Sequence, residues 1–131
     1  MKLTKKNIEK KLLGYISKFK KDKQIIAVLL FGSYARKEHF RDIDLCLVLD
    51  KKYSNNEMTE KRLKYYSMLP NVFDIQVFGQ LPLYIRKKIL EEGKVLFCKD
   101  EDKLYEIAGD TVIEFEQFKG IYNSYIENAL K

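Results

Sequence analysis

The sequence has few residues of the kinds that cross-link a chain, bind soft metals or cross a membrane. Its 131 residues include two cysteines and one histidine, and its longest uninterrupted apolar run is Ile25 to Phe31. That run is too short for a membrane span, because a transmembrane helix needs about 20 apolar residues. Cys46 and Cys98 lack the close spacing of a metal-binding pair and are too few for a disulfide framework. We therefore expect a reduced, cytoplasmic protein without a membrane segment.

Internal repeats, low-complexity tracts and the apolar segment of a signal peptide are also missing. The remaining composition is 46% hydrophobic and 34% charged, which suits a folded globular protein. Its length is typical of one domain. We expect residues 1–99 to form that domain. Residues 100–131 should add a C-terminal helical extension, packed on the same domain or on a partner.

The net charge of +6 is concentrated at the N-terminus. Residues 1–23 hold nine lysines against two acidic residues, so the rest of the chain is close to neutral. A basic helix can contact nucleic acid or an acidic partner. A solvated lysine-rich face is the simpler interpretation, and it argues against nucleic acid as the substrate.

Apolar spacing predicts alternating helices and strands, and therefore an α/β (α+β) fold with a small mixed sheet. A helix should begin after Thr4, and the third helical segment should end at Gly93. In the second helix, Met58, Leu63, Tyr66 and Leu69 are the expected inward residues. The C-terminal helical tail should consist of two pieces, with Gly120 as a weak point. The expected strands are 24–31, 42–49, 71–78 and 95–98, and the expected helices are 5–19, 57–69, 81–92 and 100–131.

Three aspartates stand at unusual places in the expected strands. Asp42 and Asp44 should share one face of their strand with Cys46, and Ile43 with its alternate neighbours should form the core face. Asp74 lies inside the strand NVFDIQVF, although aspartate is depleted in strands. Convergent carboxylates suit Mg²⁺, which takes one or two of them together with substrate phosphates. Two such ions can hold the attacking and leaving oxygens of a phosphoryl displacement.

A Gly32-Ser33 turn precedes the first pair of aspartates. Glycine lets the backbone approach a phosphate, and the serine hydroxyl can donate a hydrogen bond to it. Each part has an ordinary explanation alone: such turns often only connect elements, and Asp42 and Asp44 could be solvated at a strand entry. The order of phosphate turn, spacer and carboxylates favours nucleotidyl transfer.

Other candidate residues have simpler explanations. His39 could contact a phosphate, but it is more simply a surface loop residue. Cys46 has no neighbour in sequence that would activate a thiolate. The nine tyrosines, including Tyr65 and Tyr66, could stack on bases, but most stand at spacings that indicate core packing.

The segments FGSYAR, DIDLCLVL, NVFDIQVF and LPLYIRKKILEEGKVLF together resemble the minimal nucleotidyltransferases (MNT) of the DNA polymerase β superfamily. The resemblance covers about residues 24–98. It implies a polymerase-β-type nucleotidyltransferase fold in which Gly32 and Ser33 bind the phosphates of ATP. By the same resemblance, Asp42 and Asp44 bind Mg²⁺, and Asp74 is the third catalytic and metal-binding carboxylate.

The resemblance also implies a function. Such proteins often act as antitoxins that transfer AMP to a tyrosine of a HEPN-family toxin, with which they can assemble. The short chain leaves little room for an acceptor domain, which favours this interpretation over a polymerase. Two alternatives stay open: a non-catalytic antitoxin that only binds its toxin, and a small-molecule nucleotidyltransferase of the aminoglycoside-modifying kind. The eight-residue spacer between Ser33 and Asp42 is shorter than the usual spacer of about ten.

Overall fold

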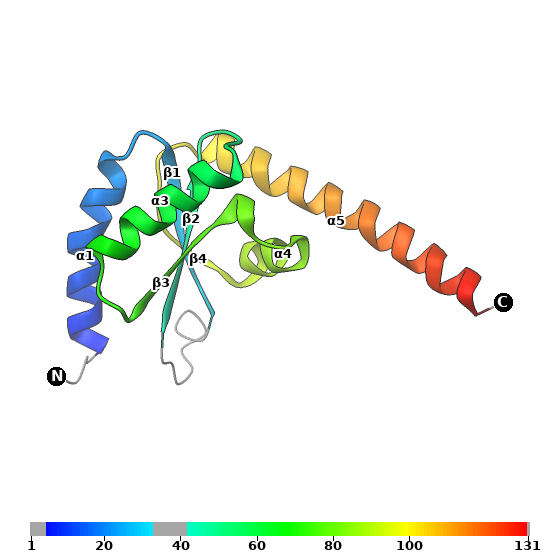
Figure 1. Cartoon of the computed structure of the whole chain (residues 1–131), viewed down its shortest axis with the longest axis horizontal. Helices are drawn as coiled ribbons and strands as arrows, with labels where there is room; N and C mark the ends of the chain where they lie inside the picture. Colours follow the sequence, from blue (N-terminus) through cyan, green and yellow to red (C-terminus); the bar gives the residue numbers. More distant parts are fainter. Residues whose placement is uncertain (1–4, 33–41, 131) are drawn as a thin grey trace.

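The computed structural model describes residues 5–32 and 42–130, with side chains from residue 10 onward. The described chain alternates helices and strands, as the apolar spacing predicts, and it ends in one long helix (Figure 1). The elements are α1 (Lys5–Lys21), β1 (Ile25–Phe31), β2 (Ile43–Leu49), α3 (Asn55–Met68), β3 (Phe73–Val77), the short 3₁₀ helix η1 (Phe78–Gln80), α4 (Leu83–Glu92), β4 (Lys94–Cys98) and α5 (Glu101–Ala129).

The four strands form one mixed sheet in the order β3-β2-β1-β4. Strand β1 is antiparallel to both of its neighbours, whereas β2 and β3 are parallel. Parallel strands need a crossover connection, and helix α3 provides it. The mixed sheet confirms the fold class that the sequence predicts.

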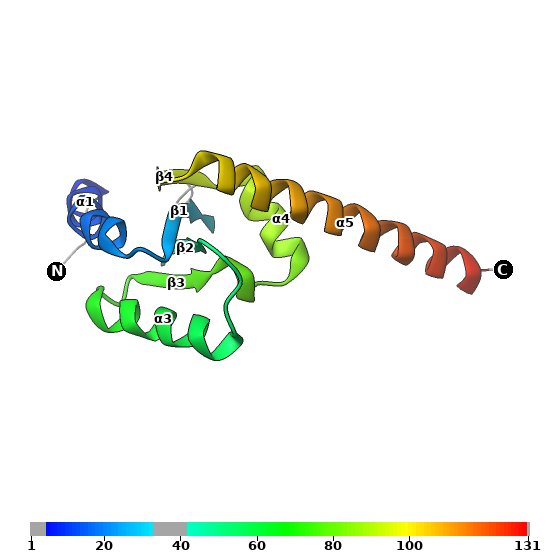
Figure 2. The same ribbon diagram turned by 90° about the horizontal axis from the view of Figure 1, so that it is seen from above.

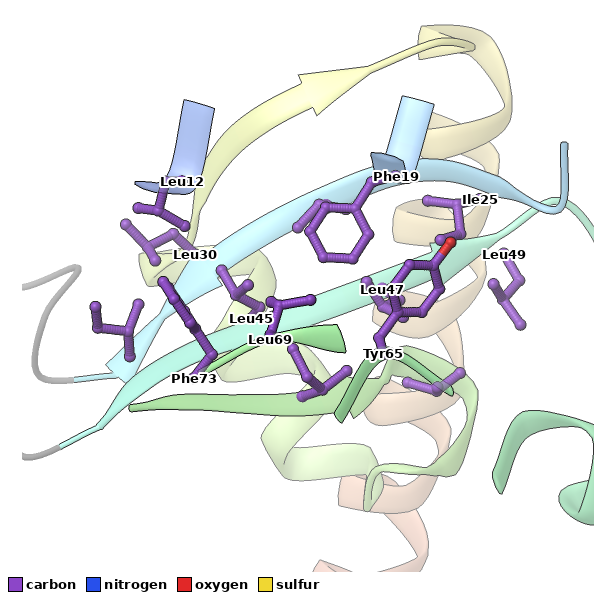
Figure 3. Close-up of a cluster of buried hydrophobic side chains, with 14 residues drawn as sticks. Leu12, Phe19, Ile25, Leu30, Leu45, Leu47, Leu49, Tyr65, Leu69 and Phe73 are labelled. Atoms are coloured by element: carbon purple, nitrogen blue, oxygen red, sulfur yellow. The ribbon is translucent and has the colours of Figure 1, made fainter. Parts of the chain in front are cut away.

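Helices α1 and α3 cover one face of the sheet. Leu12 and Phe19 of α1 meet Tyr65 of α3, and Leu69 just after that helix, over the apolar side chains of the strands (Figure 3). The expected inward face of α3 is wrong at one position, because Leu63 is 60% exposed. Tyr65 is 1% exposed and fills the place beside Phe19, with ring centroids 4.8 Å apart.

The opposite face of the sheet is covered by α4 and the first part of α5 (Figure 2). Cys46 and Val48 are buried in this second apolar cluster with Ile89 of α4. The expectation that only the Ile43 face of β2 is core is therefore incomplete. On this second face of β2, only Asp44 near the start of the strand stays partly exposed.

Helix α5 is continuous over 29 residues, so the expected division into two pieces is wrong. At 1.5 Å per residue it is about 43 Å long. Its first turns pack on α4 and the sheet, whereas the rest extends away from the domain (Figures 1 and 2). Large apolar side chains stay exposed on that part: Phe118, Ile121, Tyr122 and Tyr125 are each more than half exposed.

Within residues 5–32 and 42–130, no helix is both long and apolar enough to span a membrane.

Candidate active site

Gly32 ends strand β1 in a conformation that only glycine adopts easily. Its φ is +76°, in the left-handed region. A Cβ atom built on Gly32 would lie 2.1 Å from Oδ2 of Asp44, far inside van der Waals contact. The glycine is therefore needed for two reasons: the turn of the backbone and the close approach of the Asp44 carboxylate.

Asp44 and Asp74 lie side by side on neighbouring strands. They are register partners in the parallel pairing of β2 with β3. Adjacent strands are about 4.8 Å apart, and residues in register project from the same face of the sheet. Asp44 is also the register partner of Phe31, the last residue of β1. The sheet thus gathers the end of β1 and two of the three predicted carboxylates at one edge.

The other predicted site residues do not share this register pairing or lie outside the described part of the chain. Asp42 is exposed and lies one residue before the start of β2, close to Asp44 in sequence. Ser33 and His39 lie outside the described residues. Within the described ranges, no group of three or more His, Cys, Asp or Glu side chains is close enough to hold a metal ion by itself. The structure therefore brings Asp44 and Asp74 together, and it does not gather Asp42 with them into a three-carboxylate cage.

The donor set fits a divalent ion of the Mg²⁺ type. Carboxylate oxygens are hard ligands, and Mg²⁺ is usually held by one or two of them, with water and substrate phosphates completing its shell. The close approach of Gly32 to Asp44 keeps side-chain bulk away from that carboxylate. Asp44 would be such a ligand; Asp42 lies two residues before it in the chain, and Asp74 lies in register with it in the sheet.

Two residues that the sequence did not single out for the site hold Asp74. The Tyr66 hydroxyl of α3 donates a hydrogen bond to Oδ1 of Asp74, and Nε2 of Gln76 donates to the same oxygen at 3.1 Å. Desolvation and the hydrogen bond to Asp74 raise the pKa of Tyr66. The sequence pattern could have predicted the contact of Gln76 with Asp74, because the two residues lie two positions apart on β3 and share a face. It could not have predicted the contact of Tyr66, because that contact depends on how α3 lies against the edge strand.

A hollow of about 190 Å³ adjoins Gly32. Its walls are mainly apolar, from Phe31, Ile85 and Ile89, and Lys88 and Glu92 complete them. A larger hollow of about 670 Å³ opens at the other end of β2, between that strand, α3 and α5. The larger hollow contains none of the predicted site residues, whereas the small hollow contains one of them, Gly32.

Cys46 shares a face with Asp44 but has no place in the chemistry. It is completely buried, and burial raises the pKa of its thiol. A thiol held in its neutral form is a poor nucleophile and a poor metal ligand.

Comparison with known proteins identifies the family in which this chain belongs. Residues 15–102 match the family described as polymerase beta, nucleotidyltransferase. The match takes in the glycine turn and both aspartate-bearing strands. The chain belongs to the polymerase beta nucleotidyltransferase family, as the resemblance in its motifs implied.

A relative from Methanocaldococcus jannaschii, whose name designates it a protein adenylyltransferase, is 39% identical over 85 residues. The alignment covers 63% of this chain and 63% of the relative.

Solved structures of toxin–antitoxin complexes share the fold. One, described as a toxin–antitoxin with AMP-PNP, matches with a TM-score of 0.66 at 20% identity, over 90% of this chain and 98% of the other. A second is described as a tri-AMPylated HEPN toxin of Shewanella oneidensis in complex with its MNT antitoxin. It matches with a TM-score of 0.63 at 18% identity, over 94% and 96% of the two chains. At these identities the likeness concerns the fold.

Proposed function

We propose that this chain transfers AMP from ATP to a protein hydroxyl, and that the acceptor is a tyrosine of a HEPN-family toxin. The observation that carries the proposal is the register pairing of Asp44 with Asp74 beside the glycine that ends β1. This arrangement puts two partly exposed carboxylates side by side, next to the buried residues Cys46 and Val48 of β2. Membership of the nucleotidyltransferase family supports the reaction class.

The residues have separate roles in this proposal. Gly32 and Ser33 bind the nucleotide phosphates, Asp42 and Asp44 hold Mg²⁺, and Asp74 receives the proton of the acceptor hydroxyl. Mg²⁺, when bound, neutralises charge on the phosphates and on the leaving pyrophosphate. The tyrosine oxygen forms a bond to the α-phosphorus of ATP, and the bond from that phosphorus to the pyrophosphate oxygen breaks. Catalysis then depends mainly on positioning and charge stabilisation.

The relatives support the acceptor class. The Methanocaldococcus jannaschii relative is named for protein adenylyltransferase activity, and the Shewanella oneidensis complex contains an AMPylated HEPN toxin beside its MNT antitoxin. By analogy, this chain acts as an antitoxin and assembles with its toxin in the cytoplasm. Both of its cysteines are free thiols, which agrees with a reducing compartment.

The direct test is AMP transfer to the cognate HEPN-family protein. The chain is incubated with ATP labelled at the α-phosphate, Mg²⁺ and that protein, and label on the protein is measured. Asp44→Asn should lower the rate by at least about 10²-fold, since it removes a charge that stabilises the transition state. Asp50→Asn makes the same chemical change just beyond the other end of β2 and should transfer normally. Chelation of Mg²⁺ by EDTA should stop the reaction.

Other outcomes favour the alternative functions. Equal labelling by Asp44→Asn and the unchanged chain would rule out the metal-site mechanism. If no label appears but the toxin is still inhibited, the chain is a binding antitoxin that acts by occlusion. Label that appears only on an added aminoglycoside would indicate a small-molecule nucleotidyltransferase.

A further inference from the structure

The contact between Tyr66 and Asp74 resembles the arrangement that the proposed reaction requires. A general base must lie within hydrogen-bond reach of the proton that it removes. The Tyr66 hydroxyl already donates a hydrogen bond to Oδ1 of Asp74. It is a phenol, the same chemical group as the proposed acceptor. Asp74 is in register with Asp44, so this phenol contacts the neighbour of a carboxylate that would hold the metal.

The ring of Tyr66 is held in place by its neighbour on α3. The guanidinium of Arg62 lies over the ring, 5.4 Å from its centroid. Arg62 is itself fixed, because its Nε donates to the carbonyl oxygen of Ile75 on β3 at 2.8 Å. An acceptor held in a fixed orientation avoids much of the entropy cost of a bimolecular reaction.

The adjacent residue provides a contrast. Tyr65 also donates its hydroxyl to an aspartate, Oδ2 of Asp22 at 2.7 Å. That pair is structural: Tyr65 is 1% exposed, and Asp22 also binds Lys61 at 2.7 Å. Tyr66 is only partly buried, and its aspartate belongs to the candidate active site. One helix therefore presents two similar hydrogen bonds, one in the core and one at the site.

We propose that Tyr66 is an acceptor within the chain, so that the protein adenylylates its own Tyr66 when no partner tyrosine is bound. This inference rests on the proposed function. In the reaction, Oη of Tyr66 bonds to the α-phosphorus of ATP, its proton passes to Asp74, and pyrophosphate leaves with the electrons of the broken P–O bond. The product is an AMP group joined to Tyr66 by a phosphodiester bond.

Two consequences follow from this position. A partner tyrosine must displace the Tyr66 hydroxyl from Asp74 before it can react. Once Tyr66 carries AMP, the modified side chain occupies the place of the next acceptor. Transfer to self and transfer to a partner therefore compete for the same carboxylate.

The test uses the full chain with α-labelled ATP and Mg²⁺, with and without the cognate HEPN-family protein. Peptide mass spectrometry locates any AMP group. The unchanged chain should be labelled at Tyr66 when alone, and added partner should reduce that label. Tyr66→Phe keeps the ring under Arg62 and should lower self-labelling to background. Tyr65→Phe is the matched control, and it should leave self-labelling at Tyr66 intact if the chain folds.

Mixing variants tests whether the reaction occurs within one chain. Asp74→Asn keeps the Tyr66 acceptor but should lose about 10²–10⁴-fold in rate with its base. When Asp74→Asn is mixed with the Tyr66→Phe chain, neither should become labelled, because the acceptor and the base are on different molecules. Circular dichroism of each variant establishes that it is folded.

Several outcomes would overturn the inference. If the chain labels its partner but never itself, Tyr66 is not an acceptor and the proposed function stands. Labelling at another residue, or labelling in the mixture of variants, also contradicts the inference. A chain that labels neither itself nor the partner contradicts the proposed function as well.

Discussion

Replacing Gly32 with alanine tests the geometry of the candidate site most directly. The substitution has two effects that can be measured separately. Alanine at a φ of +76° costs about 1–2 kcal/mol, because a side chain clashes with the backbone in the left-handed region. For a domain of this size, that cost should lower the Tm by about 3–10 °C. Thermal unfolding followed by circular dichroism measures this first effect.

The second effect concerns Asp44. The new Cβ atom would lie 2.1 Å from Oδ2 of Asp44, so the carboxylate must move by about 1 Å to restore an ordinary contact. A displacement of that size at a reacting centre can cost about 10²-fold in rate. We therefore expect Gly32→Ala to lose AMP transfer by about that factor, even at temperatures where the variant remains folded.

A matched control is available in α5. A Cβ atom on Gly120 meets nothing within 4 Å, and the residue lies inside a helix. Gly120→Ala should thus leave AMP transfer unchanged. If Gly32→Ala retains both the Tm and the transfer rate of the unchanged chain, the reasoning about this turn is refuted.

The remaining predictions concern stability. Asp22 is partly desolvated, which acts to raise its pKa, but hydrogen bonds from Lys61, Tyr65 and the Gln24 backbone outweigh this and lower the pKa from its usual 3.8. The ionised Asp22 carboxylate therefore stabilises the folded chain. This contribution is complete above about pH 4 and is lost as the pH falls through the folded-state pKa of Asp22. Urea unfolding at pH 7 and pH 3 should show this loss, and Asp22→Asn should be less stable at pH 7 by about 2–4 kcal/mol and depend less on pH. If the stability of Asp22→Asn depends on pH as strongly as that of the unchanged chain, this account of the Asp22 carboxylate is wrong. Gly120→Ala should stabilise the chain by about 0.5–1 kcal/mol, measured by the same urea titration, and a loss of stability would show that α5 needs a flexible point there.

The sequence allowed the sheet and its aspartates to be predicted because both depend on local patterns. Alternation along β2 places Asp44 opposite the Ile43 face, and the isolated Asp74 marks a strand with an unusual polar residue. The register that brings the two together is a long-range property. The unusual aspartates suggested that the two strands pair side by side, but neither segment alone specifies the register of that pairing.

The features that the sequence did not reveal depend on packing between distant segments. Tyr65 and Tyr66 are neighbours of the same type, and only the rotation of α3 decides which one enters the core and which one reaches Asp74. Likewise, Cys46 is buried because α4 and α5 return to cover its face of the sheet. Gly120 was expected to be a weak point of the last helix, but its cost of about 1 kcal/mol is small beside the hydrogen bonds of a 29-residue helix.

The register of β2 with β3 also links correct folding of the sheet to formation of the site. Side chains alternate along a strand, so a slip of one residue in this pairing would turn Asp74 toward the apolar layer and expose Ile75. Ile75 is fully buried in the native register, and burying an unpaired carboxylate in its place would cost several kcal/mol. The core thus discriminates against misregistered chains, and the two carboxylates meet only in molecules whose sheet has formed correctly. The fraction of chains that bind Mg²⁺ and nucleotide would then measure the fraction with a correctly formed sheet, because a misregistered chain lacks the paired carboxylates.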